Sequence, residues 1–173
     1  MLRTRIGVSI LIVLNWLLIS KFMLIIVPVH LQDQKQIQIG RLIEEFHLSS
    51  KLASSFYNIG EDTQLDPFLL CSIAQTESRF RLNARSPKNY KGILQTPFAT
   101  MKWADVDILI GARILKDKLW IANGDLLKAL QLYKGGNNPE ALKEAKDVLR
   151  IYDDAKLNED TASFPTGNRP FIF

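Results

Sequence analysis

The most continuous run of apolar residues in the chain lies near its start. Residues 6–29 are nearly all apolar, and 24 residues at roughly 1.5 Å each can cross a hydrocarbon layer roughly 30 Å thick. Arg3 and Arg5 precede this segment, and the positive-inside tendency then places the rest of the chain outside the cytoplasm. We predict a single-pass helix in the cytoplasmic (inner) membrane, with the following domain on its periplasmic or outer side. A cleaved signal peptide is the alternative.

After residue 29 the apolar residues recur at the three- and four-residue spacing of helices. We assign 30–48 to a linker and first helical segment, 49–157 to a helical domain and 158–173 to an irregular tail. The expected helices span about 39–46, 49–60, 67–80, 105–119, 126–133 and 139–152, and a short helical turn is expected at 92–95. No segment alternates as a strand would. The pattern predicts an all-α domain of about six helices.

Capping residues and glycines indicate where these helices begin and end. Asp66 is expected to cap the helix that follows it, and Gly60 to end the helix before it. Asp105 or Asp107 is expected to cap the next long helix, and Asn138 the last one.

One position of the 67–80 helix carries a charge where its pattern predicts a core residue. The apolar positions include Leu70, Ile73 and Ala74, and the next position at the same spacing is Glu77. Burial and the partial negative charge at a helix C-terminus both raise the pKa of a carboxyl group. A carboxyl protonated near neutral pH is what a glycosidase needs to protonate a leaving oxygen. The alternative is a glutamate at the edge of the apolar face that reaches solvent.

Composition adds constraints on partners and cofactors. The 173 residues are 47% hydrophobic and carry a net charge of +4. Arg3, Arg5 and Lys21 account for three of these positive charges, and the rest of the chain holds 19 basic and 18 acidic residues. This balance is not typical of nucleic-acid binding. The single cysteine, Cys71, excludes an internal disulfide, and the two histidines have no partner at metal-ligand spacing, so we expect neither a metal nor a cofactor.

The segment 78–104 has six basic residues and no acidic one: Arg79, Arg81, Arg85, Lys88, Lys91 and Lys102. It forms either a positive rim beside Glu77 that suits an anionic partner or an ordinary solvated loop.

Three blocks of residues follow one another between about 50 and 155. They are Glu77-Ser78; Ala84-x-Ser86-Pro87 leading to Gly92-Ile93-Leu94-Gln95 with Thr100 beyond; and Ala129-Leu130-x-x-Tyr133-x-Gly135-Gly136. Together they resemble the catalytic domain of the SLT-type lytic transglycosylases, goose-lysozyme-like enzymes that cleave the glycan strands of peptidoglycan. The resemblance implies a lysozyme-like helical fold.

The resemblance also implies a mechanism with one carboxyl group. Glu77 would protonate the oxygen between N-acetylmuramic acid and N-acetylglucosamine, and would then accept the proton of the muramoyl C6 hydroxyl as a 1,6-anhydro ring closes. Two alternatives stay open. A muramidase of the same fold would use water and a second acid, such as Asp105, Asp107 or a more distant one. A catalytically silent scaffold would bind peptidoglycan without cutting it.

The family's substrate-binding residues correspond here to Ser86, Gly92, Ile93, Leu94, Gln95 and Tyr133, with Lys91, Lys134 and Tyr152 as further candidates. Ser86 could instead cap the turn at Pro87, and Tyr133 and Tyr152 could instead pack on the core.

Three departures from the family pattern stand out. Lys134 replaces the usual asparagine after the tyrosine, Asn89-Tyr90 replaces the usual glycine-alanine, and Phe98 stands where a proline is expected. We expect these changes to alter the lining of the groove and not the catalytic acid. The expected partners are peptidoglycan glycan strands, the lipid bilayer through residues 6–29 and, as a further candidate, an envelope-spanning assembly.

Overall fold

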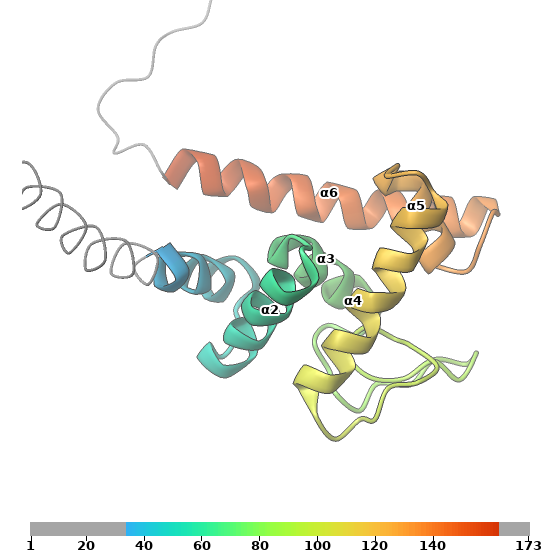
Figure 1. The fold of residues 1–173 in the computed structure, drawn as a ribbon, viewed down its shortest axis with the longest axis horizontal. Coiled ribbons are helices and arrows are strands. Elements are labelled where there is room, and N and C mark those ends of the chain that lie inside the picture. Colours follow the sequence, from blue (N-terminus) through green and yellow to red (C-terminus); the bar gives the residue numbers. More distant parts are fainter. Residues whose placement is uncertain (1–33, 163–173) are drawn as a thin grey trace, which may run out of the picture. The chain divides into compact units, whose positions relative to one another are not determined.

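The computed structural model describes residues 34–162, and every regular element in that range is a helix (Figure 1). Residues 34–46 are helical, followed by α2 (Ser50–Thr63), α3 (Pro67–Glu77), α4 (Ala104–Ile121), α5 (Leu126–Tyr133) and α6 (Pro139–Ala162). In the described part, strand-like pairing is limited to two isolated antiparallel bridges, Arg85 with Lys91 and Lys91 with Thr96. The predicted all-α fold is confirmed for these residues.

The predicted membrane helix at 6–29 lies outside the described residues, as do residues 163–173 of the tail. Among the helices that are described, none is long and apolar enough to cross a membrane. The chain divides into two units, 1–38 and 39–173, and the elements discussed below belong to the second.

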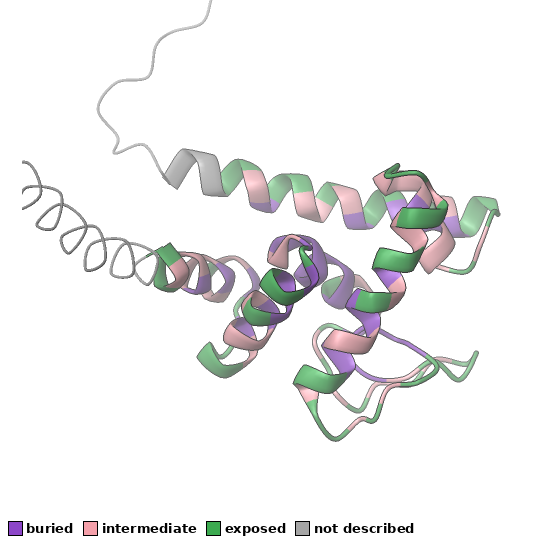
Figure 2. Cartoon of the chain, in the orientation of Figure 1, coloured by how far each residue is buried: buried purple, intermediate pink, exposed green. Residues whose placement is uncertain are grey.

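Helix α3 lies at the centre of the hydrophobic core. Its residues 68–74 are all buried, because the run Phe-Leu-Leu-Cys-Ser-Ile-Ala is apolar on every side of the helix (Figure 2). Helices α2 and α6 pack against α3, α4 packs against α2 and α5, and α5 packs against α6. Because its apolar run stops before its last turn, α3 presents Glu77 at the point where the core ends.

The predicted caps of α3 and α6 are confirmed. The Asp66 carboxylate accepts a hydrogen bond from the Phe68 N–H at 2.8 Å, and the Asn138 side-chain oxygen accepts one from the Ala141 N–H at 2.9 Å. Helix α6 continues to Ala162, past its predicted end at about residue 152 and into the segment from residue 158 that was predicted to be an irregular tail.

The boundary predictions for the end of α2 and the start of α4 are wrong. Helix α2 passes through Gly60 and ends at Thr63, where Gln64 takes the left-handed conformation (φ 57°). Gly60 instead allows a close approach, because a Cβ there would lie 2.7 Å from a side-chain carbon of Pro67. Helix α4 begins after Trp103 without a side-chain cap, so neither Asp105 nor Asp107 caps it.

The segment between α3 and α4 is an irregular loop that is pinned to the core. Residues 92–95 form a turn and not the predicted helical turn, since Gly92 (φ 75°) and Gln95 (φ 45°) have left-handed backbone angles. The turn is closed by paired backbone hydrogen bonds between Lys91 and Thr96, at 2.9 and 3.0 Å. Gly92 also leaves space for Asp107, whose carboxylate would lie 2.7 Å from an added Cβ.

Candidate active site

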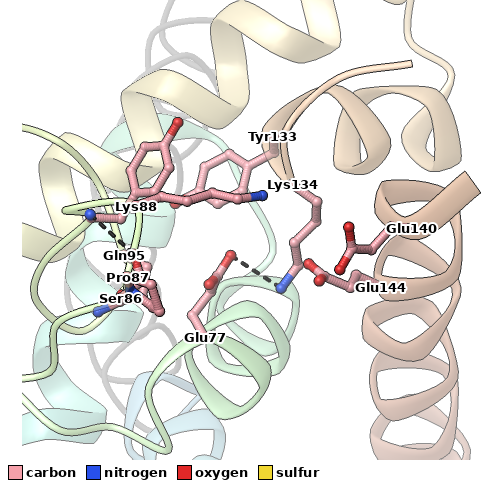
Figure 3. Close-up of a pocket in the computed structure, with 10 residues that line it drawn as sticks. Glu77, Ser86, Pro87, Lys88, Gln95, Tyr133, Lys134, Glu140 and Glu144 are labelled. Atoms are coloured by element: carbon pink, nitrogen blue, oxygen red, sulfur yellow. Dashed lines mark hydrogen bonds and ion pairs between the residues drawn. The ribbon is translucent and has the colours of Figure 1, made fainter. Parts of the chain in front are cut away.

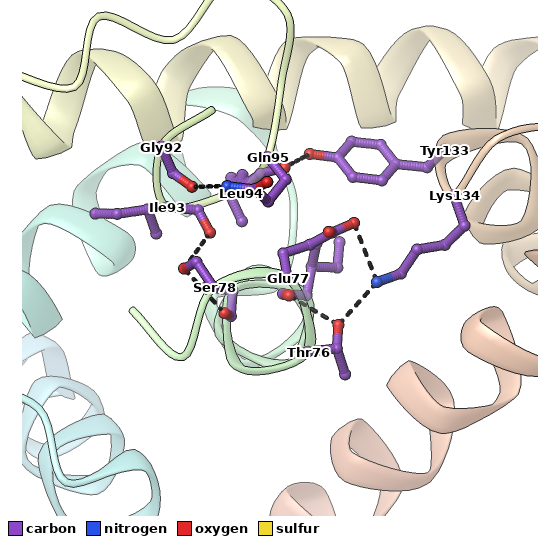
Figure 4. A network of polar contacts seen from close by, with 11 residues as sticks. Thr76, Glu77, Ser78, Gly92, Ile93, Leu94, Gln95, Tyr133 and Lys134 are labelled. Carbon is purple, nitrogen blue, oxygen red and sulfur yellow. Dashed lines mark hydrogen bonds and ion pairs between the residues drawn. The ribbon is translucent and has the colours of Figure 1, made fainter. Parts of the chain in front are cut away.

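Glu77 is the last residue of α3, and the chain turns sharply after it. Arg79 and Phe80 both have positive φ angles (53° and 61°), which ends the helix three residues before its predicted end at Phe80. The Ser78 hydroxyl donates to the Ile93 carbonyl at 2.7 Å, and this bond ties the end of α3 to the 92–95 turn (Figure 4). Two of the three sequence blocks therefore meet at Glu77.

The Glu77 side chain is 18% exposed and opens into a cavity of about 280 Å³. Four parts of the chain line the cavity, namely the end of α3, the loop at 86–95, the end of α5 and the start of α6. The lining residues are Glu77, Ser86, Pro87, Lys88, Tyr90, Gln95, Tyr133, Lys134, Glu140 and Glu144. Figure 3 shows Glu77 with Ser86 and Gln95 on one side and Lys134, Glu140 and Glu144 on the other. The cavity volume lies just below the range of about 300–1,000 Å³ that is typical of small-molecule sites.

Lys134 makes a direct contact with Glu77. Its ammonium lies 3.0 Å from a carboxylate oxygen of Glu77 and donates to the Thr76 hydroxyl at 2.9 Å (Figure 4). The Lys134 side chain is only 3% exposed. The expectation that Lys134 affects the groove lining but not the acid is therefore wrong, because the lysine is an ion-pair partner of the acid itself.

The pKa of Glu77 is raised above its ordinary value. Burial is the largest cause; the charge and the hydrogen bond of Lys134 lower the pKa, and the nearby Glu144 carboxylate raises it again. The upward direction agrees with the prediction from the helix pattern. A carboxyl group in this environment is protonated more readily than a solvated glutamate, as a general acid must be.

Tyr133 contacts the 92–95 turn, because its hydroxyl donates a hydrogen bond to the Leu94 carbonyl at 2.8 Å. Its side chain also lines the cavity, and burial, with a smaller contribution from the Glu77 charge, raises the pKa of the phenol well above its usual value. The tyrosine thus connects α5 to the 92–95 turn beside the acid.

The remaining candidates of the second block divide into two groups. Gln95 and Ser86 line the cavity; the Gln95 amide donates to the Gly92 carbonyl at 2.8 Å, and the Ser86 hydroxyl accepts from the Tyr90 N–H at 3.1 Å. Gly92, Ile93 and Leu94 are buried behind the cavity and do not line it.

Two of the further candidates lie away from the cavity. The Tyr152 hydroxyl donates to the Asp66 carboxylate at 2.9 Å, at the opposite end of α3 from Glu77. Lys91 does not line the cavity, and its backbone pairs with Thr96. The structure therefore brings Glu77, Ser86, Gln95, Tyr133 and Lys134 together and leaves Lys91 and Tyr152 out.

The family model named Transglycosylase SLT domain matches residues 54–151, which is more than half of the chain. This chain belongs to the SLT transglycosylase family. No curated protein and no solved structure matches it. The matched range extends from α2 into α6 and contains every residue that lines the cavity. Membership of this family supports an activity of the protein on peptidoglycan.

Two acidic residues of this SLT domain lie in the site although sequence reasoning missed them. Glu140 and Glu144 are four residues apart in the first turns of α6 and line the cavity across from the loop. Their spacing on one helix face, just after the Gly135-Gly136 pair, was a signal that could have found them.

The two acids considered for hydrolysis, Asp105 and Asp107, do not line the cavity. Asp107 is buried, and its carboxylate accepts hydrogen bonds from the Thr100 N–H and hydroxyl (2.6 and 2.8 Å) and the Met101 N–H (3.0 Å). It holds the loop that leads into α4.

The loop between α3 and α4 follows the expectation for the cavity lining at one of its two departures from the family pattern and not at the other. Tyr90, one of the departures from the family pattern, lines the cavity, whereas Phe98 does not and is 72% exposed. Of the six basic residues of this segment, Lys88 lines the cavity. Within residues 34–162, no group of three or more histidine, cysteine, aspartate or glutamate side chains is placed to hold a metal ion.

Proposed function

We propose that the chain is a peptidoglycan lytic transglycosylase that cleaves the β-1,4 bond between N-acetylmuramic acid and N-acetylglucosamine without water. Glu77 is the single general acid and base. The observation that carries this proposal is the position of Glu77, which ends an apolar helix, is largely buried and opens into a cavity. Family membership supports the choice of substrate.

The reaction runs in two steps on the same carboxyl group. Protonated Glu77 first gives its proton to the glycosidic oxygen as the bond from that oxygen to C1 of the muramoyl residue breaks. The resulting carboxylate then accepts the proton of the C6 hydroxyl as the C6 oxygen bonds to C1 and closes the 1,6-anhydro ring. The raised pKa of Glu77 supports the first step.

Side chains around Glu77 supply contacts for a sugar. Gln95 and Ser86 offer polar groups on the loop side of the cavity, and Tyr90 offers an aromatic ring. Lys88 adds a positive charge that suits the carboxylates of lactyl groups and stem peptides. Arg79 and Arg85 are exposed on the same loop, although neither lines the cavity.

A hydrolytic muramidase is the second candidate, because Glu140 and Glu144 line the same cavity and either carboxylate could activate water. The products distinguish the two reactions. A transglycosylase leaves anhydro ends on the muramic acid, and a muramidase leaves reducing ends.

The test is digestion of purified peptidoglycan by the full chain, with mass analysis of the released fragments. We expect anhydro-ended muropeptides from the wild type and none from Glu77→Gln, whose amide oxygen can still accept the hydrogen bond of Lys134. Glu61→Gln, an exposed position on α2, is the matched control and should release fragments like the wild type. No release by the wild type, or equal release by Glu77→Gln, would refute the assignment. Wild-type protein that retains peptidoglycan strands in a pull-down but does not cut them would point to a scaffold.

We also propose that residues 6–29 anchor the protein in the cytoplasmic membrane with the SLT domain outside. The apolar length of the segment and the preceding Arg3 and Arg5 support this location. Protease added to intact spheroplasts should digest the SLT domain while the protein stays in the membrane fraction. Protection of the domain, or its recovery as soluble protein, would contradict the proposed location.

A further inference from the structure

Lys134 connects two helices that are distant in the sequence. It is the C-cap residue of α5, and its side chain reaches the last turn of α3, where it contacts Thr76 and Glu77. Thr76 is 58 residues away along the chain. Since the Lys134 side chain is almost fully buried, its ammonium depends on these two partners in place of water (Figure 4).

The charges that face Glu77 come from each element around the cavity. Helix α5 contributes Lys134 and the phenol of Tyr133, helix α6 contributes Glu140 and Glu144, and the loop contributes Lys88 and Tyr90. The positive charge of Lys134 is in direct contact with the carboxylate, and Figure 3 shows its ammonium on the side of Glu77 that faces Glu140 and Glu144.

We propose that Lys134 is a positioning residue of the cleavage reaction, which orients the Glu77 carboxyl group and sets the upper pH limit of activity by favouring its charged form. This inference rests on the proposed function. The reaction uses Glu77 first as an acid and then as a base, so neither form can be strongly disfavoured. The apolar end of α3 favours the neutral acid, and the Lys134 ammonium offsets that preference.

A neutral side chain at 134 removes this offset but leaves the burial of Glu77. The acid then keeps its proton to higher pH, and the descending limb of the pH profile of kcat/KM moves upward. An opposite charge in direct contact lowers the pKa of a carboxyl group by about one unit or more, which is a tenfold change in its ionisation equilibrium. At a pH well above the wild-type midpoint, a neutral variant should therefore retain about tenfold more of its own maximal kcat/KM than the wild type retains.

The experiment measures pH profiles of kcat/KM for the full chain with wild-type Lys134, Lys134→Met, Lys134→Gln and Lys134→Arg. In both neutral variants the descending limb of the pH profile should move upward, although glutamine can still donate hydrogen bonds. Lys134→Arg should keep the descending limb of the wild type, because arginine keeps the positive charge. A second measurement does not need activity. The ¹³C shift of the Glu77 carboxyl, assigned by its loss in Glu77→Gln, should titrate at higher pH in the neutral variants.

The outcomes separate the two proposals. If the wild type releases anhydro fragments and the neutral variants titrate and react with the wild-type pH profile, the role of Lys134 is refuted while the proposed function stands. If the wild type releases nothing, the proposed function fails, and the ¹³C titration still decides whether Lys134 controls the protonation of Glu77. Should Lys134→Met fail to fold, Lys134→Gln gives the same comparison.

Discussion

Removing the Glu77 carboxylate should destabilise the fold more than removing its lysine partner. In Glu77→Ala the Lys134 ammonium, whose side chain is 3% exposed, keeps only the neutral Thr76 hydroxyl at 2.9 Å. In Lys134→Met the Glu77 carboxyl is left without its cation, but it can take up a proton, and at 18% exposure it already contacts the water-accessible cavity.

The magnitude follows from the burial of the two partners. Breaking a buried ion pair by removing one partner costs about 3–5 kcal/mol, since an uncompensated charge remains. Because Glu77 borders the cavity and water can enter there, we expect the lower end, about 3 kcal/mol, for Glu77→Ala. Lys134→Met should cost about 1 kcal/mol or less, since a methionine of similar length fills the space and the acid can protonate. Glu77→Gln keeps an oxygen acceptor and should fall between the two.

Urea unfolding of the full chain, followed by circular dichroism at pH 7, measures these differences. The double variant Glu77→Ala with Lys134→Met completes a double-mutant cycle and should recover most of the loss seen in Glu77→Ala, because no buried charge then remains. Equal stability of Glu77→Ala and wild type would refute the reasoning, as would a double variant that is no more stable than Glu77→Ala.

Two further predictions concern the other side chains of the cavity. Tyr133→Phe leaves the buried Leu94 carbonyl without its 2.8 Å hydrogen bond. We therefore expect this substitution to lower the free energy of unfolding by about 1–3 kcal/mol and to reduce kcat/KM. An unchanged urea midpoint would contradict this. Glu144→Gln removes a charge that raises the pKa of Glu77, so the descending limb of the pH profile should move to lower pH while the products keep their anhydro ends. Loss of cutting in Glu144→Gln would instead favour a two-carboxylate muramidase.

Features that depend on neighbouring residues could be predicted from the sequence. Asp66 caps α3 as expected, because capping is decided within one helical turn. The position of Glu77 at the edge of the core could be predicted from the apolar spacing along that same helix. Ser86 and Gln95 reach the cavity as the resemblance implied.

Features that depend on which segments meet could not be predicted in this way. The contact of Lys134 with Thr76 joins positions 58 residues apart, and periodicity along a helix carries no information about such a pair. The same holds for Asp107, which looks like a cap in sequence but lies in the first turn of α4 and binds the preceding loop. Gly60 looks like a helix end in sequence, but the lack of a side chain there allows close packing against Pro67 within the helix.

The 92–95 turn illustrates how a sequence block can contribute to a site without facing it. Three consecutive carbonyls, at 92–94, each accept a hydrogen bond from a side chain, namely those of Gln95, Ser78 and Tyr133. These donors come from the turn itself, the end of α3 and the end of α5, so the turn fixes the relative positions of the segments that surround Glu77. Because these carbonyls already have partners within the protein, we infer that the block holds the loop in register with the acid, and that contacts with a sugar come from the side chains that the loop then presents to the cavity.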